Sequence, residues 1–196
     1  MKPASRRSAE NNPFRVSQFE SLKWQPDSGS IDQIFETWQK NKFRGQLTGN
    51  HGAGKSTLSK KLKRKAQELG FDCMYLFANA ESRRADFNYW ESKLNEASPE
   101  TLVIYDGFGH ASLLRRRKLL KKQKCLVLVH SKLKKLPLIC HLAPDPQLFQ
   151  KLVTQLAGDE SAAVLEKAGG VDFLLKKHNA NLRDCFFELY RSWQNI

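Results

Sequence analysis

The feature that most constrains this chain of 196 residues is a glycine-rich stretch in its first third. Gly49 is followed by four residues and then by Gly54, Lys55 and Ser56, which is the spacing G-x-x-x-x-G-K-[ST] of the Walker A phosphate-binding loop. The glycines let the backbone curl so that successive N–H groups point at phosphate oxygens. In such a loop the lysine supplies a positive charge for the β- and γ-phosphates, and the serine hydroxyl binds Mg²⁺.

The motif stands in the setting that it requires. Residues 43–48 predict a short strand, and the apolar residues Leu58, Leu62, Ala66 and Leu69 recur at helical spacing until Gly70. The positive end of that helix dipole would face the bound phosphates. The predicted nucleotide contacts are Gly49, Asn50, His51, Gly52, Ala53, Gly54, Lys55, Ser56 and Thr57, with Lys55 also acting as the catalytic charge and Ser56 as a metal ligand.

Apolar runs alternate with amphipathic segments as far as residue 142. The runs at 71–78, 101–106, 125–129 and 136–142 predict four further strands, and segments 31–40, 85–97 and 111–124 predict helices. The run at 71–78 is nearly continuous, as expected for a strand buried on both faces, and Pro137 favours an edge position for the last strand. This alternation predicts an α/β fold in three layers with a mainly parallel five-stranded sheet.

The predicted third strand, 101–106, ends in Asp106. An apolar run that ends in aspartate is the Walker B pattern, in which the carboxylate binds Mg²⁺ beside the Walker A serine. Asp106 is therefore predicted to be a metal ligand together with Ser56.

The pattern divides the chain into three parts. Residues 1–12 are polar and basic and are expected to be a disordered tail, residues 13–144 a nucleotide-binding domain, and residues 145–196 a small helical, lid-like subdomain whose last helix is capped by Asn181. The N-terminus has no apolar signal core, and no apolar run approaches the ~18 residues of a membrane span. We therefore expect a cytoplasmic protein without a membrane span.

The formal net charge of +13 is concentrated in one region. No Asp or Glu occurs between residues 107 and 144, and the basic stretch 115–135 carries Arg115, Arg116, Arg117, Lys118, Lys121, Lys122, Lys124, Lys132, Lys134 and Lys135. Such a stretch attracts polyanions, so nucleic acid or an acidic protein is a candidate partner, although a solvated helix face is also consistent with it. No aromatic residue is interleaved with these charges, which disfavours a base-stacking platform.

The four cysteines, at 73, 125, 140 and 185, form no C-x-x-C pair and are expected to be buried, reduced thiols. Cys140 and His141 are adjacent in a predicted strand, so their side chains would point to opposite faces and make a poor metal site.

The order of these motifs resembles the additional-strand class of P-loop ATPases, and most of all a minimal AAA+ ATPase. The opening Asn12-Pro13-Phe14 resembles AAA-type ATPases of the secretion and transposition helper kind. The resemblance implies ATP and Mg²⁺ as ligands, an oligomer as an option, a sensor 1 role for His130 and Ser131, and a nucleotide-contacting sensor 2 role for Arg183 in the sequence Asn181-Leu182-Arg183.

The chain departs from that family at one catalytic position. AAA+ proteins usually carry a glutamate directly after the Walker B aspartate, and this chain has Gly107 there. Glu81, just past the predicted second strand, is the available candidate for the general base that must reach the attacking water. The arginine finger stays open among Arg83, Arg84 and residues 115–117.

Three functions remain open at this point. The first is an ATP-binding and ATP-hydrolysing AAA+-like protein that couples nucleotide state to a partner. The second is a small-molecule or nucleotide kinase, for which Arg115, Arg116 and Arg117 would serve as an arginine-rich lid. The third is an ATP-gated nucleic-acid or protein adaptor with little turnover. ATP is preferred over GTP because no guanine-specifying N/T-K-x-D motif occurs.

Overall fold

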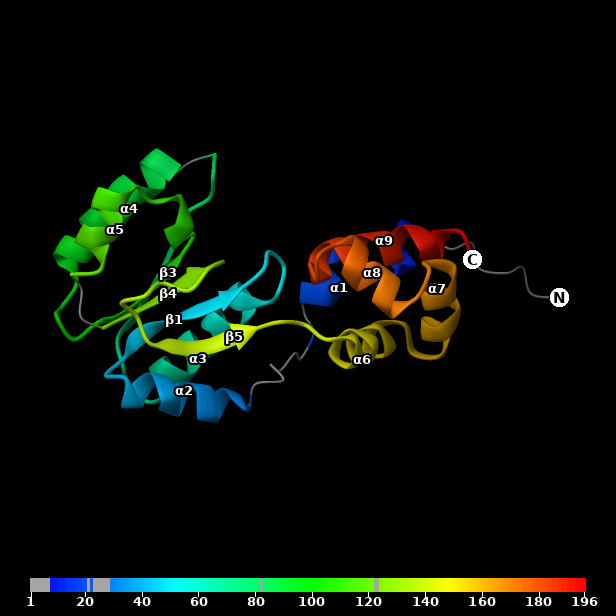
Figure 1. The fold of residues 1–196 in the computed structure, drawn as a ribbon, viewed down its shortest axis with the longest axis horizontal. Coiled ribbons are helices and arrows are strands. Elements are labelled where there is room, and N and C mark those ends of the chain that lie inside the picture. Colours follow the sequence, from blue (N-terminus) through cyan, green and yellow to red (C-terminus); the bar gives the residue numbers. More distant parts are fainter. Residues whose placement is uncertain (1–7, 21, 23–28, 82, 122–123) are drawn as a thin grey trace. The chain divides into compact units, whose positions relative to one another are not determined.

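A computed structural model describes residues 8–20, 22, 29–81, 83–121 and 124–196. The chain forms two compact units, which are described separately (Figure 1). The sheet unit comprises Ser28–Gly49 and Gly54–Leu142, and the helical unit comprises Met1–Asp27, Asn50–Ala53 and Ala143–Ile196.

The sheet unit is built on five parallel strands. They are β1 (Arg44–Gly49), β2 (Cys73–Phe77), β3 (Leu102–Asp106), β4 (Cys125–Val129) and β5 (Leu138–Leu142), in the spatial order β2-β3-β4-β1-β5. All four strand pairs are parallel, so the carboxyl ends of the strands meet at one edge of the sheet. The predicted α/β fold with a five-stranded sheet is confirmed, and β5 is an edge strand as Pro137 indicated.

Helices cover both faces of this sheet (Figure 1). Helices α2 (Ile31–Lys40) and α3 (Lys55–Glu68) lie on one face, and α4 (Arg83–Glu96) and α5 (Leu113–Leu119) lie on the other. The core on the α4–α5 side packs Phe87, Trp90 and Leu119 against strand residues that include Val103 and Val127. The helix predicted over 31–40 is confirmed, and a capping box between Ser30 and Gln33 fixes its start.

One predicted strand lies at an edge of the sheet, and one predicted helix is shorter than expected. Strand β2 was expected to be buried on both faces, and Cys73 and Leu76 are buried on opposite faces of it, but it is an edge strand and its end residue Phe77 is 56% exposed. Apolar content does not reveal the order of strands in a sheet, which depends on long-range pairing. Helix α5 ends at Leu119 rather than at residue 124, with Leu120 as its C-cap, and Lys122 lies outside the described residues.

Gln46 is a fully buried polar side chain that ties β1 to the β4–β5 connection. Its Nε2 donates to the carbonyl oxygens of Leu133 and Leu136 at 2.8 and 2.6 Å, and its Oε1 accepts from the Leu133 N–H at 2.7 Å. These bonds hold the chain before β5 in place without regular secondary structure.

Replacing Gln46 by leucine is expected to destabilise the protein strongly. The substitution leaves up to three buried backbone groups without partners, at about 1–3 kcal/mol for each, so we expect a loss of at least about 2 kcal/mol in the free energy of unfolding. Urea denaturation measures this loss, and Gln39→Leu, at an exposed position of α2, is the control. Equal stability of the two variants would contradict the prediction.

The helical unit contains α1 (Val16–Glu20), α6 (Pro146–Ala157), α7 (Ser161–Lys167), α8 (Val171–Lys177) and α9 (Leu182–Gln194), with short 3₁₀ turns at Ala9–Asn11 and Gly158–Glu160. Its core stacks Phe186 of α9 against Phe14 and Phe149, with ring centroids 6.4 and 5.6 Å apart. Asn181 caps α9 as predicted, since its side chain accepts from the Arg183 N–H.

The segment Asn12-Pro13-Phe14 anchors the start of the chain to α9. The Asn12 side chain donates to the Tyr190 carbonyl oxygen and accepts from the Phe14 N–H, both at 2.9 Å, and Phe14 is fully buried. Residues 1–12 were expected to form a disordered tail, but residues 8–12 are ordered. The hydrogen bonds of the buried Asn12 fix this segment to the helical unit. Residues 1–7 of the expected tail lie outside the described residues.

Glu188 of α9 makes the helical unit sensitive to acid. It accepts from Lys177 Nζ at 2.6 Å and lies 2.5 Å from His178 Nε2. The hydrogen bond from Lys177 is the main reason why the pKa of Glu188 lies below its usual value. A depressed carboxyl pKa stabilises the fold above the unfolded-state value of about 4.3, and the contribution is lost as the pH falls through the folded-state pKa.

We therefore expect acidification from pH 7 to about 3 to cost the wild type more stability than Glu188→Gln, by less than about 1 kcal/mol, because the pair is near the surface. Urea unfolding at the two pH values measures the difference. Glu166→Gln, at an exposed position of α7, should behave like the wild type. An equal acid loss in the wild type and Glu188→Gln would rule out this contribution.

All four cysteines are free and buried, as expected. Burial raises the pKa of the thiols of Cys73 and Cys185 to about 12 and that of Cys125 to about 11. Within the described part of the chain, no helix has both the length and the apolar character that crossing a membrane requires.

Candidate functional site

The glycine-rich loop connects the carboxyl end of β1 to the first turn of α3. Gly49 has φ +150°, and a Cβ there would lie 2.4 Å from the Leu142 carbonyl oxygen. Gly54 precedes α3 in a left-handed conformation, with φ 92°. Glycine is therefore needed at both ends of the loop for backbone reasons.

Lys55 curls back over the start of the loop. Its Nζ donates to the Gly49 carbonyl oxygen at 2.8 Å. Burial lowers the pKa of Lys55, and the negative charge of Asp106 opposes this shift. The lysine is thus a half-buried cation with the carboxylate of Asp106 nearby. The predicted pair of Walker A and Walker B motifs places these two residues close together.

Asp106, the last residue of β3, is held by a side chain that sequence reasoning did not single out. The Tyr75 hydroxyl of β2 donates to Asp106 Oδ2 at 2.5 Å, and burial, followed by this bond, raises the pKa of Tyr75. The Tyr75 phenol also has a neighbour on α3, the helix that begins with Lys55 and Ser56. Ser59 Oγ of α3 lies 3.4 Å from Tyr75 Oη and 3.0 Å from the Ser56 carbonyl oxygen. The only sequence signal for Tyr75 is a polar-tipped ring near the end of an otherwise apolar strand.

Tyr75 and Ser59 connect the predicted metal ligands. Strand β4 lies between β1 and β3, which separates the loop-bearing strand from the Asp106 strand by roughly 10 Å. Helix α3 spans this gap, because Ser59 on it contacts both the Ser56 carbonyl oxygen and the phenol that bonds Asp106. A serine hydroxyl and one carboxylate are a donor set that suits Mg²⁺ when phosphate oxygens and water complete its shell. Among the described residues, no group of three or more His, Cys, Asp or Glu could hold a metal without such help.

Gly107, directly after Asp106, has a backbone conformation and surroundings that suit only glycine. It has φ 91°, and a Cβ at this position would lie 2.0 Å from the carbonyl oxygen of Ala78. The Ala78 N–H is itself bonded to the Asp106 carbonyl oxygen at 2.9 Å, which fixes that approach. The backbone therefore excludes any side chain at residue 107.

Glu81, the candidate base, is exposed in the turn that follows β2. Its N–H donates to Asn79 Oδ1 at 2.9 Å. The Asn79 N–H in turn lies 3.2 Å from Asp86 Oδ2 of α4. Arg84 is exposed at the start of α4, so no arginine finger is assigned among these residues, and the catalytic role of Glu81 stays a prediction.

The tip of the loop, Asn50–Ala53, belongs to the helical unit. There Asn50 Nδ2 donates to the Asn179 carbonyl oxygen at 3.3 Å. Gly52 has φ 69°, and a Cβ on it would lie 1.7 Å from Asn181 Oδ1. The loop tip thus rests against the turn before α9, two residues from the predicted sensor Arg183, which is exposed in the first turn of that helix. Ala53 is buried, His51 is exposed, and Thr57 is exposed on α3.

The predicted sensor 1 residues follow the carboxyl end of β4. Val129 is in register with Thr48 of β1, so His130 and Ser131 continue the chain beside the start of the glycine loop. Both are exposed. The sheet therefore brings them to the same edge as Asp106.

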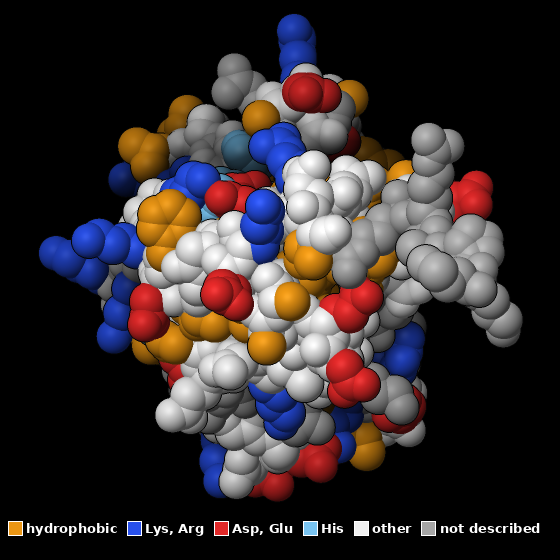
Figure 2. Space-filling view, turned by 90° about the vertical axis from the view of Figure 1, so that its right-hand side faces the viewer, with side chains coloured by type: hydrophobic (Ala, Val, Ile, Leu, Met, Phe, Trp, Pro, Cys, Tyr) orange, Lys and Arg blue, Asp and Glu red, His pale blue; other side chains and the backbone are white. Residues whose placement is uncertain are grey.

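The basic stretch is not one free surface. Arg115 donates to Asn88 Oδ1 at 3.2 Å and covers the Phe87 ring, while Arg116 donates to the Ala111 carbonyl oxygen at 2.9 Å and covers the Phe108 ring. Lys118 and Lys124 are paired with Glu91 and Glu100. Figure 2 views the right-hand side of Figure 1, where Lys and Arg side chains lie among Asp and Glu side chains; it does not single out the basic stretch.

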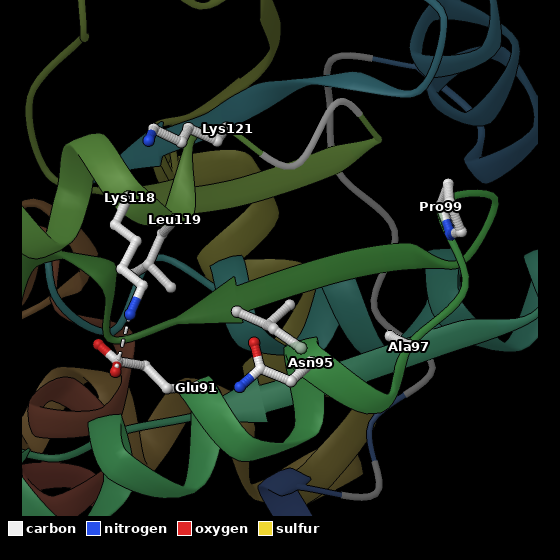
Figure 3. Close-up of a pocket in the computed structure, with 8 residues that line it drawn as sticks. Glu91, Asn95, Ala97, Pro99, Lys118, Leu119 and Lys121 are labelled. Atoms are coloured by element: carbon white, nitrogen blue, oxygen red, sulfur yellow. Dashed lines mark hydrogen bonds and ion pairs between the residues drawn. The ribbon is translucent and has the colours of Figure 1, made fainter.

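A cavity of about 370 Å³ lies away from this edge, between α4 and α5 (Figure 3). It is lined by Glu91, Leu94, Asn95, Ala97, Pro99, Lys118, Leu119 and Lys121. Lys118 and Glu91 pair across it at 3.0 Å, and Pro99 precedes the amino end of β3, opposite to Asp106. This cavity therefore does not include the residues of the sequence motifs.

Comparisons of the chain with protein-family models and with curated proteins find no match.

Proposed function

We propose that this protein binds Mg-ATP at the Gly49–Thr57 loop and hydrolyses it slowly, so that nucleotide occupancy acts as a switch. The observation that carries the proposal is that Lys55 and Ser56 begin α3 directly after β1, while Tyr75 and Ser59 connect the Ser56 backbone to Asp106 at the carboxyl end of the same parallel sheet, with Gly49 and Gly54 in conformations that require glycine. Ligands bind at this edge in open α/β sheets. The position of β4 between β1 and β3 also agrees with the additional-strand class that the sequence resembles.

Lys55 and the loop N–H groups would hold the β- and γ-phosphates, and Ser56 and Asp106 would hold Mg²⁺. The metal ion would neutralise charge that develops on the phosphates during transfer to water. His130 and Ser131, beside the loop, are proposed as polar contacts to the γ-phosphate.

Slow turnover is proposed because of Gly107. A general base must lie within hydrogen-bond reach of the attacking water. The position that usually supplies it in AAA+ proteins has no room for a side chain here. Glu81, or a group from a partner, would have to take that role.

The helical unit is proposed as the element that reports nucleotide state. The loop tip packs against the turn before α9 within that unit, and Arg183 follows two residues later. Phosphate binding that changes the conformation of the loop tip would therefore change its contacts with residues 179–181 in the turn before α9. The reporting partner is proposed to be nucleic acid or an acidic protein, because Arg117, Lys132, Lys134 and Lys135 of the basic stretch 115–135 are exposed.

The kinase alternative is less well supported. Its arginine-rich lid would use Arg115, Arg116 and Arg117, and the first two are engaged by α4 or by the turn before α5, whereas Arg117 is exposed. An adaptor with no turnover differs from our proposal only in the rate of hydrolysis.

The test is to measure equilibrium binding of ATP to the purified full chain with and without Mg²⁺, together with phosphate release from the same samples. We expect ATP binding that tightens with Mg²⁺, and phosphate release far slower than the 1–10³ s⁻¹ typical of enzymes. Absence of ATP binding at millimolar concentrations would overturn the proposal. Fast release without a partner would overturn its slow-switch part, whereas acceleration by DNA, RNA or an acidic protein would identify the partner class.

A further inference from the structure

Tyr75 stands at the centre of the proposed metal site although no motif includes it. Its hydroxyl donates to Asp106 Oδ2 at 2.5 Å. Ser59 Oγ lies 3.4 Å from the phenol oxygen and 3.0 Å from the Ser56 carbonyl oxygen. The phenol thus bonds one proposed Mg²⁺ ligand, Asp106, directly and is connected to the backbone of the other, Ser56, through Ser59.

The strand register explains this placement. Phe77 is paired with Asp106, and Tyr75 lies two residues earlier on the same edge strand, so its ring shares a face of β2 with Phe77. That face is covered by α3, which carries Ser56 and Ser59. The long side chain therefore spans from β2 to the end of β3 and the first turn of α3.

The bond has a definite effect on the carboxylate. A carboxylate can rotate and offer either oxygen to a metal or to metal-bound water. With Oδ2 held by the phenol, Asp106 keeps one orientation and offers Oδ1. Partners of this kind, which orient a metal ligand, change metal affinity by about 10–100-fold when they are removed.

We propose that Tyr75 is a positioning residue that orients Asp106 for Mg²⁺ binding. The inference rests on the proposed function, since it requires Mg²⁺ to bind beside the glycine loop. Tyr75 touches neither nucleotide nor water in this role; it acts through Asp106.

The experiment titrates the ATP affinity of the full chain with Mg²⁺. Tyr75→Phe keeps the ring and removes only the hydroxyl. We expect the Mg²⁺ concentration for half-maximal enhancement to rise about tenfold, while the ATP affinity in EDTA stays at its wild-type value. Thermal unfolding, whose midpoint the lost bond lowers, checks that the variant is folded at the temperature of the titration. The control Tyr105→Phe removes a buried phenol that bonds the Leu119 carbonyl oxygen at 3.4 Å, and it should change neither affinity.

A double-mutant cycle shows whether Tyr75 acts through Asp106. Asp106→Asn should weaken the Mg²⁺ effect by itself, and adding Tyr75→Phe to it should produce no further loss. Additive losses, a wild-type Mg²⁺ response in Tyr75→Phe, or equal weakening with and without Mg²⁺ would each overturn the inference. A wild type that binds ATP but ignores Mg²⁺, or does not bind ATP, would overturn the proposed function as well, so the two failures are distinguishable.

Discussion

Lys55→Ala is expected to weaken Mg-ATP binding by about 100-fold or more while leaving the fold intact. Charge-assisted hydrogen bonds to two phosphates, at about 1.5 kcal/mol each, amount to about 3 kcal/mol, and each 1.4 kcal/mol is about a factor of ten in affinity. The fold should tolerate the change, because burial already disfavours the charged lysine when no phosphate is present.

The matched control is Lys60→Ala, which removes the same charge from an exposed position on the same helix. Isothermal titration calorimetry with Mg-ATP measures the affinity of both variants, and thermal unfolding checks their folding. If Lys55→Ala binds as tightly as Lys60→Ala, the glycine loop is not the nucleotide site.

Gly107→Glu is expected to destabilise the protein rather than to restore a catalytic base. The substitution places a Cβ 2.0 Å from the backbone oxygen of Ala78, at a residue with φ 91°. A left-handed conformation of a non-glycine residue costs about 1–2 kcal/mol, and the steric clash adds to this because the Ala78 oxygen belongs to fixed backbone. We expect a loss of at least about 3 kcal/mol in the free energy of unfolding and no increase in phosphate release.

Gly109 provides the control for this prediction. A Cβ at Gly109 meets nothing within 4 Å, so Gly109→Glu adds the same charge two residues away without strain. Urea denaturation and phosphate release should both leave Gly109→Glu close to the wild type. A stable Gly107→Glu variant with faster release would mean that the turn after β3 adapts and that the missing glutamate alone limits turnover.

These two predictions concern the residues at which the chain agrees with, and departs from, the family that its sequence resembles. The agreement at Lys55 is a matter of local spacing. The departure at Gly107 has a structural cause that spacing cannot show, since Ala78 is 29 positions away along the chain. Lys55 could therefore be predicted from the sequence, whereas the constraint on Gly107 is visible only in the tertiary structure.

Local patterns by themselves determined most of the elements. The alternation of apolar runs predicted the α/β class and all five strands, and Ser30 and Asn181 marked the starts of their helices. The spacing of the glycine-rich loop singled out Lys55 and Ser56 as predicted phosphate and metal contacts. The apolar run 101–106, which ends in Asp106, singled out this residue as a predicted metal ligand. Such signals depend on neighbours within a few residues, so a single sequence contains them.

Only the tertiary structure decided which side chains meet. The strand order made β2 an edge strand, although its composition is that of a buried one, and that placement brought Tyr75 to Asp106. Tertiary packing also places the Ala78 carbonyl oxygen where a side chain at Gly107 would lie. It packs the loop tip Asn50–Ala53 against the turn before α9. Pairing between distant segments depends on the packing of the whole sheet and helix set, and no local period records it.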